Sequence, residues 1–210
     1  MYIPRANRED RLPVLHKLME EQPLASLVTM GSSGLIATHL PMVLVQEGNS
    51  LGTLRGHLSR ANPQWREFSP TVHALAIFSG PQHYITPTWY ETSETEGKDV
   101  PTWNYAVVHA YGYLKLIDDA DWLMAHLEEL TTIHESAVPV PWKIGDAPAG
   151  YIASLLKGIV GLEMVIERLE GKWKVSQNRS EQDRTNVAKG LDELNTPESL
   201  AMKALVEGKR

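Results

Sequence analysis

One stretch, Trp103–Leu116, constrains the fold more than any other part of the chain. Its residue types alternate with the two-residue period of a β-strand. One face carries Trp103, Tyr105, Val107, His109, Tyr111 and Tyr113, and the other carries Asn104, Ala106, Val108, Ala110, Gly112 and Leu114. Aromatic side chains on one face and small ones on the other are typical of a strand that is buried on both sides. The sequence therefore predicts a central strand of a closed β-barrel.

Further apolar runs on either side of this strand are separated by turn sequences. Gly31–Gly34 and Glu47–Ser50 join three such runs, as in an antiparallel meander. The predicted strands are Leu24–Met30, Leu35–Gln46, Ser50–Leu58, Val72–Phe78, Gln82–Thr86, Trp103–Leu116 and a run over Val160–Ile166. The predicted helices begin at Asp10 and at Asn62-Pro63, cover Asp118–Glu135 and Ala149–Leu156, and resume from about Glu181. This order favours a β-barrel with peripheral helices, of the α+β class, over an α+β sandwich.

The chain has 210 residues, enough for one domain with a helical appendage. We expect residues 1–170 to form the barrel with its inserted helices. Residues 171–210 are then a basic segment and helices that pack on the barrel or on a dimer partner. The polar segment Thr92–Lys98 has no periodicity and is predicted to be an exposed loop, near which residues could act as a lid.

Composition excludes several classes of protein. The chain has no cysteine, so it has no disulfides, thiolate metal sites or cysteine nucleophiles. Its net charge of −6 argues against broad electrostatic binding to nucleic acid. The first five residues are not followed by the apolar region of a signal peptide, and no apolar run is long enough to span a membrane. We therefore expect a cytoplasmic protein with no membrane partner.

The segment Gly56–Trp65 is the most informative candidate site. Ser59 and Arg60 directly precede Asn62-Pro63, a pair that is typical of a helix start. A helix start offers unpaired N–H groups and a partial positive charge, and Arg60 adds a full charge, so the segment fits a phosphate group. The alternative is a loop with a solvated arginine before a capped surface helix.

Other candidates are more scattered. No nucleophile elbow, zinc-binding helix or phosphate-binding loop of known pattern is present. Histidines on or near predicted strands could converge inside a barrel and ligate a metal or haem, although a buried core histidine is the commoner case. These histidines are His39, His57, His73, His83 and His109. The stretch from Arg168 to Lys189 holds six basic and three acidic residues and suits a second phosphate contact or, alternatively, a solvated basic turn.

Several contiguous blocks resemble the signature sequences of the PaiB family, bacterial proteins described as FMN-binding negative transcriptional regulators. The blocks are Ile36–Pro41, Gly56–Pro63, Gly80–Tyr90, Val100–Tyr105 and Lys174–Arg179 with Asp183-Arg184. They appear in order over nearly the whole chain. The resemblance implies an FMN-binding split β-barrel, similar to pyridoxamine phosphate oxidases and flavin reductases, that forms a homodimer with flavin at the subunit interface.

The resemblance also implies roles for individual residues. Ser59 and Arg60 would hold the FMN phosphate beside Asn62, and Thr38 and His39 would line the flavin ring. The remaining cofactor contacts that it implies are His57, Trp103, Asn104, Gln177, Asn178 and Arg184.

Three function classes stay open on the sequence alone. The first is an FMN-binding regulator without turnover, for which direct DNA binding is doubtful because the chain is acidic and shows no defensible helix-turn-helix. The second is an FMN-dependent oxidoreductase that acts on a small molecule or uses NAD(P)H, with redox chemistry supplied by the flavin. The third is a haem-binding split barrel with a strand histidine as axial ligand.

Overall fold

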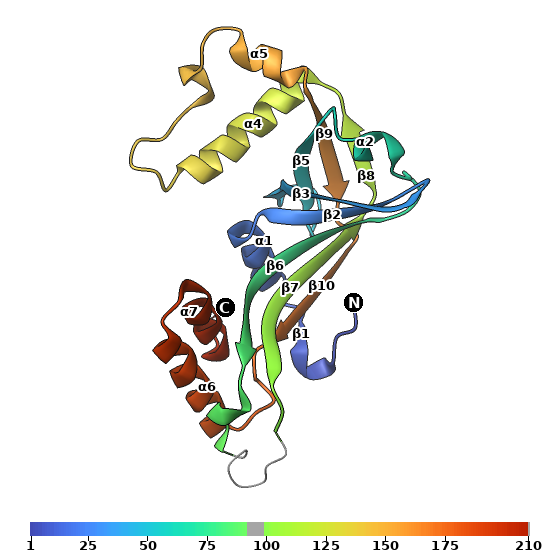
Figure 1. Ribbon diagram of the computed structural model, residues 1–210. Coiled ribbons are helices and arrows are strands. Elements are labelled where there is room, and N and C mark those ends of the chain that lie inside the picture. Colours follow the sequence, from blue (N-terminus) through green and yellow to red (C-terminus); the bar gives the residue numbers. More distant parts are fainter. Residues whose placement is uncertain (92–98, 210) are drawn as a thin grey trace. The chain divides into compact units, whose positions relative to one another are not determined.

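The computed structural model describes residues 1–91 and 99–209, which form two compact units, each assembled from separate stretches of the chain. Unit 1 consists of Met1–Gln22, Phe78–His109 and Glu170–Arg210, and unit 2 of Pro23–Ile77 and Ala110–Leu169. The strands β6 (Ala74–Ile85) and β7 (Thr102–Gly112) belong to both units (Figure 1). The expected division of the chain at residue 170 stays a prediction.

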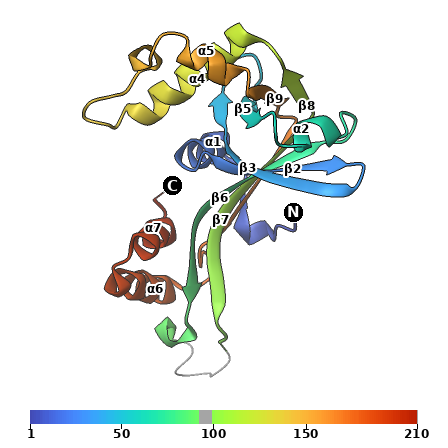
Figure 2. The same cartoon turned by 45° about the horizontal axis from the view of Figure 1, so that its top comes forward.

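Unit 1 combines a sheet of order β1-β10-β7-β6 with the helices α1, α6 and α7. Apart from β6 and β7, its elements are η1 (Arg5–Asn7), β1 (Arg8–Glu9), α1 (Leu12–Glu21), η2 (Pro87–Trp89), β10 (Arg168–Lys174), α6 (Glu181–Leu194) and α7 (Pro197–Val206). The helices α6 and α7 lie side by side in Figures 1 and 2. Asn195 ends α6 in the left-handed conformation, and Thr196 caps α7 by accepting a hydrogen bond from the Ser199 backbone.

Unit 2 contains two groups of paired strands, of orders β6-β2-β3 and β4-β5-β9-β8. Its further elements are β2 (Leu24–Gly31), β3 (Gly34–Pro41), β4 (Val43–Val45), β5 (Thr53–Ser59), α2 (Gln64–Glu67), β8 (Leu114–Ile117), α4 (Ala120–Glu135), η3 (Ile144–Asp146), α5 (Tyr151–Leu156) and β9 (Ile159–Val165). The two hairpins of the predicted antiparallel meander are confirmed by the pairings of β2 with β3 and of β4 with β5, but they lie in different sheets, so a continuous meander is wrong. Figure 2 shows the β2–β3 hairpin edge on.

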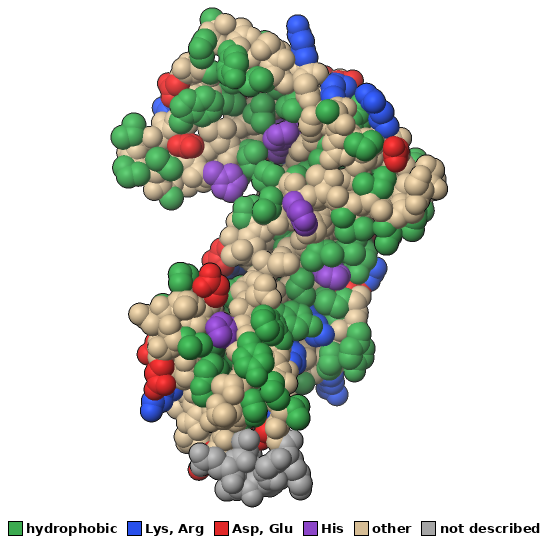
Figure 3. Space-filling model, in the orientation of Figure 1, with side chains coloured by type: hydrophobic (Ala, Val, Ile, Leu, Met, Phe, Trp, Pro, Cys, Tyr) green, Lys and Arg blue, Asp and Glu red, His purple; other side chains and the backbone are tan. Residues whose placement is uncertain are grey.

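The segment from α4 to α5 leaves apolar side chains in solvent. Figure 3 shows them at the upper left of the molecule, in the region of α4 and α5. They are Ile133, Val138, Val140, Trp142, Tyr151 and Leu155. Within residues 1–91 and 99–209, none of the helices has both the length and the apolar character that crossing a membrane requires.

The central strand β7 follows its predicted alternation on one face only. Asn104, Ala106, Val108, Ala110 and Gly112 are all buried, as their small size predicts. On the other face Trp103 remains 49% exposed, so burial on both sides is wrong for this end of the strand within a single chain. The described strands also form two sheets in place of one closed ring.

Several predicted boundaries are wrong for physical reasons. The run Leu35–Gln46 divides at Met42 into β3 and β4, which join different sheets: the Met42 N–H still pairs with the Pro23 carbonyl beside β2, whereas Val43 already pairs with Arg55 of β5. The pair Gly80-Pro81 does not break its strand; β6 continues through it. The predicted loop Thr92–Lys98 lies outside the described residues.

The first helix shows a similar difference at its start. It begins at Leu12 with Arg11 at the N-cap, and Asp10 does not cap it. Pro13 lies in the first turn, where its missing N–H has no intrahelical partner to lose. Leu15, Leu18 and Met19 are buried along one stripe of the helix.

Candidate functional site

The turn that follows β5 in unit 2 carries Ser59 and Arg60 and is held by its own hydrogen bonds. The Arg60 N–H donates to the Gly158 carbonyl at 2.8 Å, and the Asn62 N–H donates to the Ser59 carbonyl at 3.0 Å. The Ser59 hydroxyl oxygen accepts from the Ala61 N–H at 3.2 Å, which leaves the hydroxyl hydrogen for an outside acceptor. Ser59 is exposed at the end of its strand. The turn therefore presents a hydroxyl donor to solvent from a defined backbone.

Arg60 is partly exposed and carries the positive charge of this turn. Its guanidinium forms an ion pair with Asp118, whose side chain is 71% exposed. The guanidinium also lies 5.9 Å from the centre of the Trp65 ring, and the Trp65 indole N–H donates to the Arg60 carbonyl at 3.0 Å. An ion pair with one largely exposed partner contributes little stability, so an anion of higher charge can replace Asp118 at Arg60.

Asn62 links this turn to β3. Its side-chain amide donates to the Thr38 hydroxyl at 2.9 Å, and its carbonyl oxygen accepts from the Gln64 N–H at 2.9 Å. The helix α2 has four residues and starts at Gln64, with Pro63 at the N-cap, so the predicted start at Pro63 is one residue early. A helix of one turn has too small a dipole to hold a phosphate. The attraction at this turn comes from Arg60.

Thr38 and His39 are neighbours in β3 and therefore point to opposite faces of the hairpin. Thr38 pairs with Leu27 of β2 and contacts the turn through Asn62. His39 pairs with Ser26, and its Nδ1 lies 2.9 Å from the Ser26 hydroxyl on the other face. The two side chains therefore lie on opposite faces of the hairpin, and the joint role expected for them at the flavin ring stays a prediction. Of the two, Thr38 is the residue that is hydrogen-bonded to the turn after β5, through Asn62.

His57 lies two residues before Ser59 and belongs to a cluster between β5 and α4. Its Nδ1 is 3.2 Å from Nε2 of His126, which is 2% exposed. The Trp122 ring stacks on the His126 ring with centroids 5.3 Å apart. The Arg55 guanidinium lies 6.0 Å from the centre of the Trp122 ring and donates to Glu163 at 3.2 Å. His57 is thus a packed, hydrogen-bonded histidine, the commoner of the two roles considered for the strand histidines.

Burial is the main cause of the lowered pKa values of His57 and His126. Burial, with smaller effects from the neighbouring His57 and Arg55, lowers the pKa of His126 to about 4. Burial also lowers the pKa of His57. Both rings are therefore neutral at pH 7, where one donates the shared hydrogen bond and the other accepts it.

We expect the free energy of unfolding to fall by roughly 2 kcal/mol as the pH drops from about 6.5 to about 4. In this range the unfolded chain protonates His126 at its ordinary pKa, whereas the folded chain keeps it neutral down to about pH 4. Acid therefore favours the unfolded state. Urea unfolding at several pH values measures the effect, and the variant His126→Gln should lose this part of the pH dependence.

His134→Gln is the matched control for this prediction, because His134 is exposed near the end of the same helix. It should keep the full pH dependence. An identical pH dependence in the unaltered protein and in His126→Gln would show that His126 does not titrate between the folded and unfolded states.

In unit 1, Trp103 and Asn104 also point to opposite faces of their strand. Asn104 is 1% exposed and donates to the Ser176 hydroxyl at 2.9 Å. Trp103 faces solvent, where its indole N–H donates to Gln82 at 3.0 Å and its ring meets the edge of Tyr84. The two residues therefore lie on opposite sides of β7, and the flavin contacts expected of them stay a prediction. Trp103 is the accessible one.

The C-terminal candidates are mostly engaged within unit 1. The Gln177 amide donates to the carbonyls of Ala6 and Trp173, and its oxygen accepts from the Val175 N–H at 2.8 Å. Asn178 is exposed. Of the three predicted residues in this part of the chain, Asn178 is the one whose side chain has no such backbone bond within residues 1–91 and 99–209.

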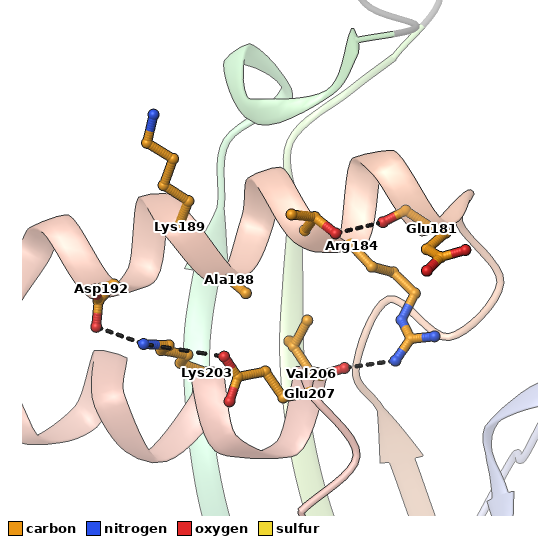
Figure 4. A pocket seen from close by; sticks show the side chains of 9 residues that line it. Glu181, Arg184, Ala188, Lys189, Asp192, Lys203, Val206 and Glu207 are labelled. Carbon is orange, nitrogen blue, oxygen red and sulfur yellow. Dashed lines mark hydrogen bonds and ion pairs between the residues drawn. The ribbon is translucent and has the colours of Figure 1, made fainter.

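Arg184, the third of these residues, lines an open groove of about 430 Å³ between α6 and α7 (Figure 4). Its guanidinium donates to the Val206 carbonyl at 2.8 Å. Lys203 in the same groove is paired with Asp192 at 2.6 Å. The groove carries acidic and basic side chains in equal number, so it has no net attraction for an anion.

The predicted basic turn after Arg168 is a strand, β10. Trp173 is buried, while Lys172 and Lys174 lie on the other face. The Lys174 ammonium donates to the Thr102 hydroxyl and to the Trp103 carbonyl at 2.8 Å. Burial, together with Lys172 and Arg179, lowers the pKa of Lys174. The basic stretch thus serves to join β10 to β7.

Two residues of the site region are not predicted from the sequence. Gln64 lies buried beneath the Ser59–Asn62 turn, and Asp118 pairs with Arg60 from 58 residues away. Nothing in the local sequence links either to the site. His126 could have been found, because it follows Leu123 by three residues on the buried face of α4.

The donors of unit 2 fit a phosphate monoester. The Arg60 guanidinium and the Ser59 hydroxyl lie on adjacent residues of one turn, and both are accessible. Arginine with a hydroxyl is a donor set suited to a dianionic phosphate. The chemistry of this turn therefore agrees with FMN, whose phosphate distinguishes it from riboflavin.

Comparisons with known proteins agree on the family and the fold. Residues 1–168 match the family model described as "Putative FMN-binding domain". The Bacillus subtilis protease synthase and sporulation protein PAI 2 is 32% identical, over 100% of this chain and 98% of its own. An uncharacterized protein of Emericella nidulans is 35% identical, over 93% and 92% of the two chains.

Solved structures share the fold at low sequence identity. The flavocytochrome Anf3 from Azotobacter vinelandii superposes with a TM-score of 0.62 at 14% identity, over 88% of this chain and 78% of its own. An FAD and heme binding protein from Mycobacterium smegmatis gives 0.56 at 16% identity, over 78% and 71%. The split β-barrel fold that the signature blocks imply is confirmed by these structures. The chain therefore belongs to the PaiB family of FMN-binding split-barrel proteins.

Proposed function

We propose that this flavin-binding protein is a regulator of gene expression that holds the FMN phosphate with Ser59 and Arg60. The observation that carries the proposal is the hydrogen-bonded turn after β5, which presents a hydroxyl and a guanidinium side by side. Thr38 and Asn62 fix that turn to β3 and lie within reach of a ligand bound there. FMN, when bound, supplies one- or two-electron redox chemistry.

The regulatory part of the proposal comes from a relative. The Bacillus subtilis protein that matches over the full length carries a name that refers to protease synthesis and sporulation. The net charge of −6 disfavours broad contact with DNA. We therefore place the regulation at the level of FMN binding or flavin redox state, with a homodimer as the acting form, and assign no DNA target.

An FMN-dependent oxidoreductase is the second candidate, and the exposed aromatic pair of unit 1 favours it. Trp103 is 49% exposed and Tyr84 is 44% exposed, with their ring centroids 6.1 Å apart. Exposed aromatic rings of this kind offer a surface on which a planar substrate or a nicotinamide ring can stack. Such an enzyme would oxidise NADH or NADPH in the presence of FMN, whereas the regulator would not turn over.

The deciding experiment is a titration of purified protein with FMN, followed by flavin fluorescence and absorption. We expect saturable binding in the micromolar range or tighter, with riboflavin bound more weakly because it lacks the phosphate. Light scattering on the same sample reports the homodimer, and NAD(P)H consumption separates oxidoreductase from regulator. A protein that binds haem with a Soret band, and FMN not at all, would overturn the proposal in favour of a haem-binding split barrel.

A further inference from the structure

Gln64 is a fully buried polar side chain directly beneath the Ser59–Arg60 turn. It is 0% exposed, although it stands at the first position of the one-turn helix α2. Glutamine is seldom buried unless its amide has specific partners. The partners of this amide therefore indicate why a glutamine stands here.

The Gln64 amide nitrogen contacts both strands of the β2–β3 hairpin. It lies 3.1 Å from the Leu27 carbonyl, 3.0 Å from the Thr29 hydroxyl and 3.3 Å from the Ile36 carbonyl. Leu27 pairs with Thr38, and Thr29 pairs with Ile36, so all three acceptors lie in one short section of the hairpin. A single side chain thus fixes the turn against two strands.

Asn62 contacts the same section of the hairpin from the same turn, through the Thr38 hydroxyl. The two amides lie two residues apart in the chain and follow Arg60 directly. Between Ser59 and Gln64, these are the side chains that bind the turn to β2 and β3 in the described structure. Their hydrogen bonds fix the position of the Ser59 and Arg60 backbone relative to Thr38.

The side-chain oxygen of Gln64 indicates that this residue does more than stabilise the fold. Its carbonyl oxygen is buried and has no hydrogen-bond donor among the described residues. A buried acceptor without a partner destabilises the fold, and an apolar side chain of similar length would avoid that cost. The amide is better explained by the geometry that its nitrogen imposes.

We infer that Gln64 is a positioning residue for the phosphate of FMN, an inference that rests on the proposed function of Ser59 and Arg60. Gln64 does not contact the phosphate. It holds the turn where the Arg60 guanidinium and the Ser59 hydroxyl converge on one anion. Loss of the amide therefore reduces the affinity for FMN but leaves riboflavin binding unchanged.

The test compares Gln64→Met with the unaltered protein in titrations with FMN and with riboflavin. Methionine matches glutamine in length but cannot make the three hydrogen bonds. We expect the affinity for FMN to fall about 10-fold and that for riboflavin to change less than about 2-fold. In the Arg60→Ala background the same substitution should cost less than about 2-fold, because the contact it positions is already gone. Gln182→Met, on the exposed face of α6, is the control and should change neither affinity.

Thr29→Val provides a second route that leaves Gln64 in place. It removes one of the three acceptors of the amide, and we expect a smaller, about 3-fold loss for FMN alone. Equal losses for FMN and riboflavin, full FMN affinity in both variants, or additive losses with Arg60→Ala would each overturn the inference. Failure of the proposed function would appear differently, as equal binding of FMN and riboflavin by the unaltered protein.

Discussion

Replacing Arg60 by alanine is expected to weaken FMN binding by about 1–3 kcal/mol, or roughly 5- to 150-fold. The substitution removes the positive charge that the turn after β5 presents to a phosphate. Riboflavin has no phosphate, so its affinity should stay within about 2-fold of the unaltered protein. Parallel titrations with the two flavins measure the difference directly.

Arg66→Ala is the matched control for this prediction. Arg66 is an exposed arginine in the adjacent helix, and its guanidinium lies 4.4 Å from the centre of the same Trp65 ring. It has the same charge and a shared neighbour but does not lie in the turn. A loss of FMN affinity in Arg66→Ala equal to that in Arg60→Ala would mean that general positive charge attracts the flavin. Full FMN affinity in Arg60→Ala would remove this turn from the site.

The parts of the fold that sequence predicted are those set by short-range pattern. The two-residue alternation in β7 predicted its buried face because successive side chains of a strand must point to opposite sides. The turn at Gly31–Gly34 predicted the β2–β3 hairpin for a similar local reason. In contrast, β10 has only Lys172, Trp173 and Lys174 at its alternating end, and two lysines beside one tryptophan look like an exposed turn.

The site could be predicted only where its residues are neighbours in sequence. Ser59 and Arg60 form one turn and were found together, whereas the Asn62–Thr38 bond joins residues 24 positions apart. The pairing of Arg60 with Asp118 spans 58 positions. Contacts of this range depend on strand order, which one sequence does not determine.

The strand period alone divides two pairs of the predicted site residues between opposite faces. Thr38 with His39, and Trp103 with Asn104, are adjacent residues on strands, so each pair divides between opposite faces. The signature blocks placed all four near the flavin but gave no information about faces. The two-residue period applied to the blocks separates Thr38 from His39 and Trp103 from Asn104. Thr38 is the member of its pair that is bonded to the turn after β5, and Trp103 is the exposed member of its pair.

Gly112→Ala is expected to destabilise the protein by about 3 kcal/mol, an effect on folding instead of on flavin binding. Gly112 ends β7 where that strand crosses close to β9 in unit 2. A methyl group at Gly112 would overlap the carbonyl oxygen of Val165 and approach Cγ of Met164 to 3.0 Å. The obstacle is backbone, which cannot move without shifting β9 from its pairing with β8. Thermal unfolding should show a midpoint lowered by roughly 6–12 °C for a chain of this size.

Gly145→Ala separates this steric effect from the general effect of replacing glycine. An added methyl at Gly145 has no atom within 4 Å, so the change in stability should stay within about 0.5 kcal/mol. Small residues on one face of β7 predict close packing inside a barrel. The contact at Gly112 gives that pattern a specific cause, the close approach of a neighbouring strand's backbone. An unfolding midpoint of Gly112→Ala equal to that of Gly145→Ala would show that β7 and β9 do not approach each other this closely.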